Sequence, residues 1–286
     1  MYSLQKALAI ENQSVDCNLL KLNKVETNTV ESNISNIHPI VNGIQGELNI
    51  FRKHGLNNLK KAKLMDRVDT KFVIKRKHLI EIMRSLQSNY SVLSIDGKEI
   101  STYENHYFDT HDMGFYTAHH NGKLNRYKIR QRHYIDSKLR FLEVKFKNNK
   151  RRTIKSRMKI SDDSYSEIDS FVKQSMGGNM PELHIKQISG YQRIAFANEN
   201  IGERITIDYD VWYQSKASDP ALELDDLCII EIKQKSYNAQ SKIFDLLKTL
   251  GYAPTSFSKY CIGCALLYSD IKTNRFKQMI KKHVNK

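Results

Sequence analysis

Basic side chains recur at every second position along residues 127–159 of this sequence. Lys128, Arg130 and Arg132 come first, and Lys145 and Lys155 follow at the same spacing in two later segments. Arginine binds phosphate oxygens in pairs through its planar guanidinium group, and lysine contributes a compact positive charge. So many cations in one pattern predict the binding of a phosphate-rich anion.

A spacing of two residues indicates β-strands, because successive side chains of a strand point to opposite faces. Between the cations lie apolar residues such as Ile129, Val144 and Met158, so each segment has a basic face and an apolar face. Two interpretations compete. An antiparallel sheet can keep its lysines and arginines in water and its apolar face on a core. Alternatively, a closed barrel can line its lumen with cations beneath an outer layer of helices.

The same pattern returns later in the chain, which favours the second interpretation. Tyr191 and Arg193 share one face of a predicted strand, and Glu231 and Lys233 lie opposite Ile232 and its neighbours in another. Sheets of about eight strands tend to close. We therefore predict an α+β fold, an antiparallel closed β-barrel with a polar, basic lumen and helices packed outside. Cations so enclosed repel one another unless a polyanion neutralises them.

Net charge is concentrated in the body of the chain. The 286 residues carry a formal charge of +15, and residues 1–50 contribute −2 of it. This charge suggests a nucleotide, polyphosphate, nucleic acid or a membrane surface as partner. We expect three regions: a polar, poorly ordered leader over residues 1–45, a barrel domain over 46–268, and a basic C-terminal helix over 269–286.

Cysteine usage and hydropathy predict a cytoplasmic protein. No apolar run approaches the roughly 20 residues of a membrane helix, and the N-terminal residues lack the pattern of a secretory signal. Cys261 and Cys264 form a lone CxxC motif without the second pair that a zinc site needs, so we expect small structural residues there. Scattered cysteines of this kind are typical of a reducing compartment.

Three histidines in one segment, His111, His119 and His120, also raise the question of a metal site. Because His119 and His120 are adjacent, their side chains diverge on either a strand or a helix. We predict no ligand role for them.

Short motifs in a characteristic order connect the sequence with a known family. Over about residues 65–267 it resembles the catalytic domain of the vacuolar transporter chaperone (VTC) proteins, which are polyphosphate polymerases of the triphosphate tunnel metalloenzyme (CYTH-like) superfamily. The motifs are Asp66-Arg67-Val68-Asp69-Thr70-Lys71-Phe72, Tyr107-Phe108-Asp109, Lys128-Ile129-Arg130-Gln131-Arg132, Phe141-Leu142-Glu143-Val144-Lys145, Ile154-Lys155-Ser156-Arg157, Gly190-Tyr191-Gln192-Arg193-Ile194-Ala195-Phe196, Arg204-Ile205-Thr206-Ile207-Asp208, Ile230-Glu231-Ile232-Lys233 and Phe257-Ser258-Lys259-Tyr260.

The resemblance implies a triphosphate tunnel and an enzyme that transfers the terminal phosphoryl group of ATP to a growing polyphosphate chain, releasing ADP. It implies Mn²⁺ or Mg²⁺ as cofactor, held by Glu231. An ion pair between Glu231 and Lys233 or a neighbouring arginine is the alternative for that carboxylate. The implied catalytic residues are Lys71, Arg130, Arg132, Lys233 and Lys259, and the implied substrate-binding residues are Lys145, Lys155, Tyr191, Arg193, Arg204 and Ser258.

Two departures from the wider pattern refine this expectation. Phosphatases of the superfamily carry an ExExK motif on the first strand, where this chain has Arg67, Asp69 and Lys71. A cation in place of one acid favours the polymerase branch. Polymerase relatives often have a lysine two residues before Phe-Ser-Lys, where this chain has Thr255 and Ser256, so one phosphate contact is expected to be missing.

Two alternative functions remain open at the level of sequence. A metal-dependent tripolyphosphatase or nucleoside triphosphatase would use Asp69, Glu143 and Glu231 as metal ligands. A non-catalytic module for polyphosphate or RNA would need exposed cations, such as those of residues 272–286. Nucleic acid is not the expected partner, and any membrane partner would be a separate chain.

Overall fold

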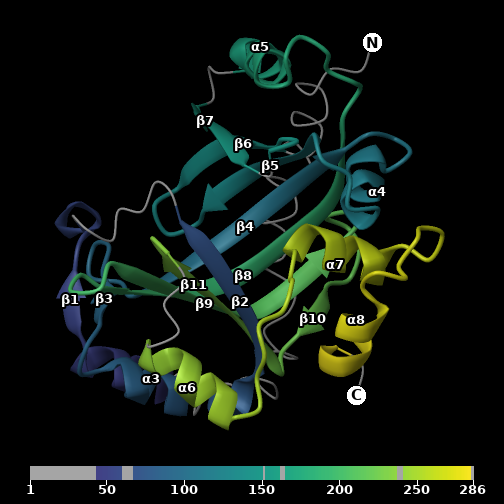
Figure 1. Ribbon diagram of the computed structural model, residues 1–286. Coiled ribbons are helices and arrows are strands. Elements are labelled where there is room, and N and C mark those ends of the chain that lie inside the picture. Colours follow the sequence, from purple (N-terminus) through teal and green to yellow (C-terminus); the bar gives the residue numbers. More distant parts are fainter. Residues whose placement is uncertain (1–42, 60–66, 151, 162–164, 237–240, 285–286) are drawn as a thin grey trace, which may run out of the picture.

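The computed structural model describes residues 43–59, 67–150, 152–161, 165–236 and 241–284 (Figure 1). Nearly all of the predicted leader, residues 1–45, lies outside the described residues. A short helix over residues 43–50 leads into the first strand. The three-region division of the chain stays a prediction.

One large sheet, antiparallel except for the pairing of β1 with β3, forms the centre of the molecule. Its strands follow the order β2-β11-β9-β8-β4-β5-β6-β7. Three short strands join the sheet at its sides: β1 (Arg52–His54), β3 (Ser91–Leu93) and β10 (Leu222–Leu224). The main strands are β2 (Val68–Lys75), β4 (Ile100–Asp109), β5 (Arg126–Tyr134), β6 (Leu139–Lys147), β7 (Thr153–Ile160), β8 (His184–Asn198), β9 (Glu203–Gln214) and β11 (Leu227–Gln234).

The sheet is not closed, so the prediction of a closed β-barrel is wrong. Strands β2 and β7 stand at the two ends of the order, and no ladder among the described residues joins them. The sheet curls strongly, with β2 drawn in front of the central strands in Figure 1. Alternating side chains fix the two faces of each strand, but closure requires a matching strand tilt and stagger. The lysines of β7 are typical of an edge strand that avoids further pairing.

Helices cover the apolar side of the sheet at two places. Helices α3 (Leu79–Leu86) and α6 (Lys242–Thr249) lie together beneath the sheet in Figure 1 and share a core with β2, β8, β9 and β11. Helix α5 (Tyr165–Ser175) packs by Ile168 and Val172 against β5 and β6. These contacts agree with the expectation of helices on the apolar side.

A third group of helices contradicts that expectation. Helix α7 (Lys259–Leu267) packs beside Val73 and Ile229, which share the face of Lys71 and Glu231. Helices α4 (Gly114–His120) and α8 (Lys277–His283) complete this group. One end of the basic side is therefore filled by apolar residues of α7.

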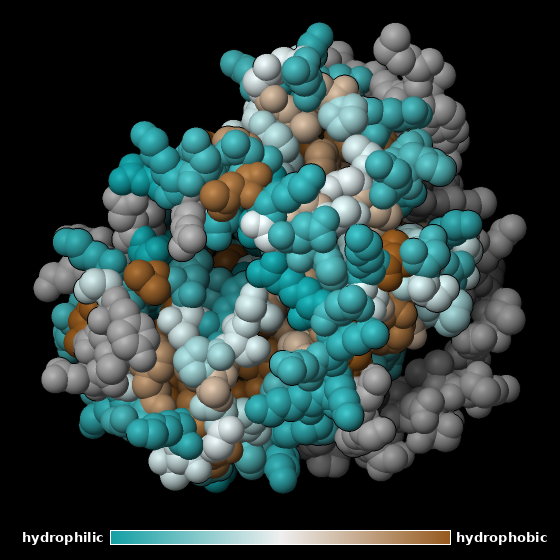
Figure 2. Space-filling view, turned by 45° about the vertical axis from the view of Figure 1, so that its right-hand side comes forward, coloured by the Kyte–Doolittle hydropathy of each residue, from teal (hydrophilic) through white to brown (hydrophobic). Residues whose placement is uncertain are grey.

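The surface is hydrophilic over most of the face seen in Figure 2, where hydrophobic residues show only as small separate patches. Residues such as Ile154 and Ile201 contribute single exposed side chains. Every helix in the described ranges is too short or too polar to span a membrane.

Candidate functional site

The residues predicted to bind phosphate all come together around one side of the sheet. Directly opposed partners share a face, and these pairs include Lys71 with Glu231, Lys233 with Arg204, and Lys145 with Lys155. We call this side the basic face. It contains Lys71, Lys128, Arg130, Arg132, Lys145, Lys155, Arg157, Tyr191, Arg193, Arg204 and Lys233 from the sheet, with Ser258 and Lys259 added from the start of α7.

Glu143 of β6 organises one end of the basic face. Its side chain is 1% exposed, and Arg130 contacts its Oε2 through Nη2 at 2.5 Å. Lys155 Nζ lies 2.6 Å and Arg157 Nε 3.9 Å from Oε1. Burial alone raises the pKa of Glu143, but Arg130, Arg132 and Lys155 outweigh it, so the pKa lies well below its usual range. One ionised carboxylate thus holds several cations and leaves an excess of positive charge.

Lys145 adds a further basic side chain beside this cluster. Arg130, together with burial, holds the pKa of Lys145 well below its usual range. Arg132 also lies close, donating to Asn105 Oδ1 at 3.1 Å and to the Tyr191 hydroxyl at 3.3 Å. Positive charges that lower one another's affinity for protons favour the binding of an anion.

Asp208 of β9 organises the centre of the basic face. Arg193 donates two hydrogen bonds to its carboxylate, from Nε to Oδ1 at 2.6 Å and from Nη2 to Oδ2 at 2.8 Å. Lys259 reaches the same carboxylate from α7 and lies 4.2 Å from the centre of the Tyr191 ring. Burial alone raises the pKa of Asp208, but Arg193 and Lys259 hold it well below its usual range.

Glu231 of β11 lies between two lysines. Lys233 Nζ donates to Oε2 at 2.8 Å, and Lys71 Nζ lies 4.0 Å from Oε1. Despite burial, these lysines hold the pKa of Glu231 well below its usual range. The ion pair between Glu231 and Lys233 considered from the sequence is therefore present, within β11.

An ionised Glu231 fits a divalent cation as a single carboxylate ligand. Mg²⁺ and related ions are commonly held by one or two carboxylates, with phosphate oxygens and water completing the shell. The three acids of the alternative metal site, Asp69, Glu143 and Glu231, do not lie together. Asp69 pairs with Arg67, and Glu143 lies on β6, several strands from β11 in the sheet order. Within the described ranges these three acids form no cluster of metal ligands.

The start of α7 brings two more polar side chains to the basic face. Ser258 caps the helix by accepting from the Cys261 amide, and its Oγ also accepts from Lys128 Nζ at 2.8 Å. Lys71 Nζ donates to the Phe257 carbonyl at 3.0 Å. This segment therefore links β2 to β5 across the basic face.

Two residues of the basic face, Lys128 and Asp208, were not among those assigned a role from the sequence. Lys128 has the same strand parity as Arg130 and Arg132, so the alternating pattern already contained it. Asp208 ends the motif Arg204-Ile205-Thr206-Ile207-Asp208, and its role as a partner of two cations depends on contacts that the sequence does not show.

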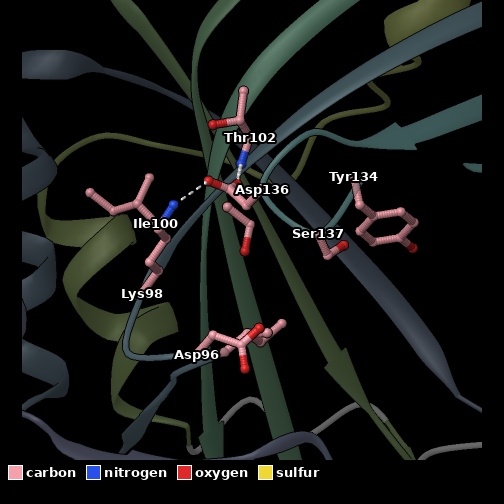
Figure 3. Close-up of a pocket in the computed structure, with 9 residues that line it drawn as sticks. Asp96, Lys98, Ile100, Thr102, Tyr134, Asp136 and Ser137 are labelled. Carbon is pink, nitrogen blue, oxygen red and sulfur yellow. Dashed lines mark hydrogen bonds and ion pairs between the residues drawn. The ribbon is translucent and has the colours of Figure 1, made fainter. Parts of the chain in front are cut away.

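A hollow at the edge of β4 and β5 adjoins the basic face (Figure 3). Ser101 and Tyr134 line it beside Asp136, which accepts from the Thr102 amide at 2.7 Å and from Lys98 at 3.4 Å. Asp136 thus pairs with the nearby lysine, so this hollow offers little charge for phosphate.

Comparisons with known proteins place these motifs in context. Residues 66–268 match the family described as VTC domain. No curated protein matches the sequence. Among solved structures, a proposed adenylate cyclase from Bacillus halodurans is similar at 12% identity and a TM-score of 0.46, over 74% of this chain and 97% of that chain. A proposed adenylyl cyclase from Hippeastrum, for which a dominant triphosphatase activity is described, is similar at 13% identity and a TM-score of 0.45, over 72% of this chain and 98% of that chain.

Proposed function

Because the chain belongs to the VTC domain family, we propose that it is a polyphosphate polymerase that extends inorganic polyphosphate with ATP and releases ADP. The resemblance seen in the short motifs is confirmed by the family match. The observation that carries the proposed reaction is the basic face, where cations from β2, β5, β6, β7, β8, β9 and β11 outnumber the acids between them.

In the proposed reaction, the terminal oxygen of the acceptor chain attacks the γ-phosphorus of ATP. The bond between that phosphorus and the β,γ-bridging oxygen breaks, and ADP leaves with the electron pair. A terminal phosphate is already ionised at neutral pH, so the protein need not supply a base. Its task is to align the reacting oxygens and neutralise the charge that develops on them.

The proposed roles are those that the family resemblance implies, and some of these cations are already anchored to buried acids. Arg193, bound to Asp208, and Arg130, bound to Glu143, are held in fixed positions before phosphate arrives. The catalytic group consists of Lys71, Arg130, Arg132, Lys233 and Lys259, and the substrate-binding group of Lys145, Lys155, Tyr191, Arg193, Arg204 and Ser258.

Glu231 is the proposed ligand of a divalent cation, Mn²⁺ or Mg²⁺. Such an ion, when bound, neutralises phosphate oxygens as a Lewis acid. Lys71 and Lys233, which flank Glu231, would contact phosphate oxygens beside it. The free, buried cysteines Cys228, Cys261 and Cys264 support a reducing, cytoplasmic site of action.

The test is to incubate the purified chain with ATP and Mn²⁺ and to separate the products. We expect a ladder of polyphosphate together with ADP. Arg130→Ala should lower the rate at least about tenfold, because a charged group positioned for the transition state is lost. Lys98→Ala is the matched control, since Lys98 is exposed and pairs with Asp136 in the adjoining hollow, outside the basic face.

Two results would redirect the assignment. Release of orthophosphate without a ladder would indicate hydrolysis, in which water replaces the acceptor chain. Binding of polyphosphate without turnover would indicate a non-catalytic module. Persistence of full activity in Arg130→Ala would contradict a reaction on the basic face.

A further inference from the structure

Three potential metal ligands meet on the side of the sheet opposite the basic face. Glu104 and His106 are two residues apart on β4, and His133 of β5 lies directly across from Glu104. His106 Nε2 is 2.8 Å and His133 Nδ1 3.5 Å from Glu104 Oε1. One ligand atom from each residue lies within 4.8 Å of the others. The cluster is separate from Glu231, which is on β11 and on the other face.

These distances suit a borderline divalent transition ion. Zn²⁺ binds imidazole nitrogen and carboxylate oxygen at about 2.0–2.2 Å in a tetrahedral shell, which places neighbouring ligand atoms about 3.3 Å apart. The two contacts to Glu104 lie on either side of that value, and the three ligand atoms all lie within 4.8 Å of one another. Imidazole also favours Zn²⁺ over Mg²⁺, which prefers oxygen ligands.

Gln131 gives a second, independent indication. Its amide lies 2.7 Å from His133 Nε2, yet its own Oε1 is buried and has no hydrogen-bond partner. Turning the amide by half a turn makes Oε1 the acceptor for the Nε2 proton of His133. His133 Nδ1 then carries a lone pair aimed at Glu104. Histidine ligands of metals characteristically donate their second ring proton in this way.

The residues around the three ligands can hold them in place and still leave one coordination position open to solvent. On the same side of the sheet, Ile100 and Ile194 lie beyond one end of the cluster, and Phe108 and Ile129 beyond the other. His106 is buried, whereas 31% of the Glu104 side chain is exposed. Water can therefore complete the coordination shell from the solvent side.

We propose that Glu104, His106 and His133 bind a divalent transition ion such as Zn²⁺. The ion would cross-link β4 to β5, whose opposite sides carry Asn105 and Arg132 of the basic face. The site is independent of the proposed polymerase reaction. It would hold the two strands in register whether or not phosphate is bound.

The test measures metal binding, with no nucleotide present. Zn²⁺ is titrated by calorimetry into full-length, metal-stripped protein, and thermal unfolding is followed in parallel. We expect one equivalent of Zn²⁺ and a rise in Tm of about 5 °C at saturating metal, because the ion binds only the folded state. Co²⁺ should give the visible absorption spectrum of a low-coordinate site with nitrogen and oxygen ligands.

Variants locate the binding site. Glu104→Gln and His133→Ala should each weaken Zn²⁺ binding more than tenfold, while Gln131→Ala should weaken it about tenfold and keep the one-to-one ratio. His111→Ala is the control, because His111 is exposed and meets the His184 ring edge-on, away from the cluster. If His133→Ala fails to fold, Glu104→Gln decides, since glutamine keeps the volume of the side chain.

Absence of Zn²⁺ binding by the wild-type chain would overturn the proposal. Binding of equal strength in wild type and Glu104→Gln would do the same, as it would place the metal elsewhere. Loss of binding in His111→Ala to the same degree as in Glu104→Gln would also contradict the assignment.

Discussion

Single buried carboxylates set the positions of the cations on the basic face. Glu143 and Asp208 are almost inaccessible, and each contacts more than one basic side chain. Each acid carries one negative charge, so it orders its partners without neutralising them. A polyanion can therefore bind cations that are already in place, which lowers the entropy cost of binding.

Replacing Glu143 by glutamine tests this view of the buried acids. We expect Glu143→Gln to lower the free energy of unfolding by about 3 kcal/mol, because Arg130 and Lys155 lose their buried partner. Urea denaturation gives the value. Asp96→Asn, at an exposed turn, is the control and should change stability little. Equal stability of wild type and Glu143→Gln would show that Glu143 does not anchor the cluster.

The pH dependence of stability tests Asp208 in the same way. Its pKa is depressed in the folded protein, so it stabilises the fold above the unfolded value of about 3.9, and this contribution is lost as pH falls towards the folded value. Between about pH 6 and pH 3, wild type should lose more stability than Asp208→Asn. Parallel losses in the two proteins, measured by urea unfolding, would contradict the assignment.

At the scale of elements, α7 determines the shape of one end of the site. Gly263 lies so close to β8 and β9 that an added Cβ would come within 2.3 Å of Gln187 Nε2 and 2.5 Å of Tyr213 Cδ1. Only glycine permits this approach. It keeps Ser258 and Lys259, at the start of the same helix, in contact with Lys128 and Asp208.

Gly263→Ala should therefore displace α7. We expect a loss of about 1–3 kcal/mol in stability from overpacking, and weaker binding of polyphosphate because Lys259 moves. Gly46→Ala is the matched control, since no atom lies within 4 Å of its added Cβ in the helix of residues 43–50. Alanine there should stabilise the protein by roughly 0.5–1 kcal/mol. Unchanged binding in Gly263→Ala would show that α7 does not position Lys259.

The sequence predicts well which residues share a strand face, and it predicts poorly on which side of the sheet α7 packs. Alternation in β5, β6 and β11 predicted which residues of each strand share a face, because strand parity is a local property. Helix α7 is apolar almost all round, so no face of it indicates a partner. Strand β3 pairs with β1 and β8 and not with β4, the next strand in sequence, and this pairing depends on contacts distant along the chain.

At the scale of the whole molecule, charge is divided between the basic face and the remaining surface. The C-terminal helix α8 is basic at Lys277, Lys281 and Lys282, but Met279 and Ile280 pack it against the core of α7. Whole-chain charge attracts any polyanion, whereas the basic face gathers cations from many strands on one side of the sheet. Whether the sheet closes into a barrel could not be predicted from the sequence, because curvature arises from strand tilt and stagger along the full width of the sheet.

Ionic strength distinguishes long-range attraction by exposed lysines from contacts on the basic face. Long-range attraction by exposed lysines is screened over about 8 Å at physiological ionic strength, whereas contacts on the basic face are screened less. Raising the salt concentration should therefore reduce the association rate for polyphosphate more than it raises the dissociation rate. Stopped-flow binding measures both rates. A salt effect confined to the dissociation rate would contradict this division.

Affinity for polyphosphate in two variants of equal charge tests the central claim most directly. One combines Arg132→Ala, Lys145→Ala and Arg204→Ala, and the other Lys277→Ala, Lys281→Ala and Lys282→Ala. The first removes cations that lie close to other cations, Lys145 near Arg130 and Arg132, and Arg204 near Arg67 and Arg193, so the fold should hold. We predict a loss of affinity of about 100-fold or more in the first variant, at roughly 1 kcal/mol or more per contact, and less than about tenfold in the second. Equal losses in both variants would contradict the account, because they would show that polyphosphate responds to net charge and not to the basic face.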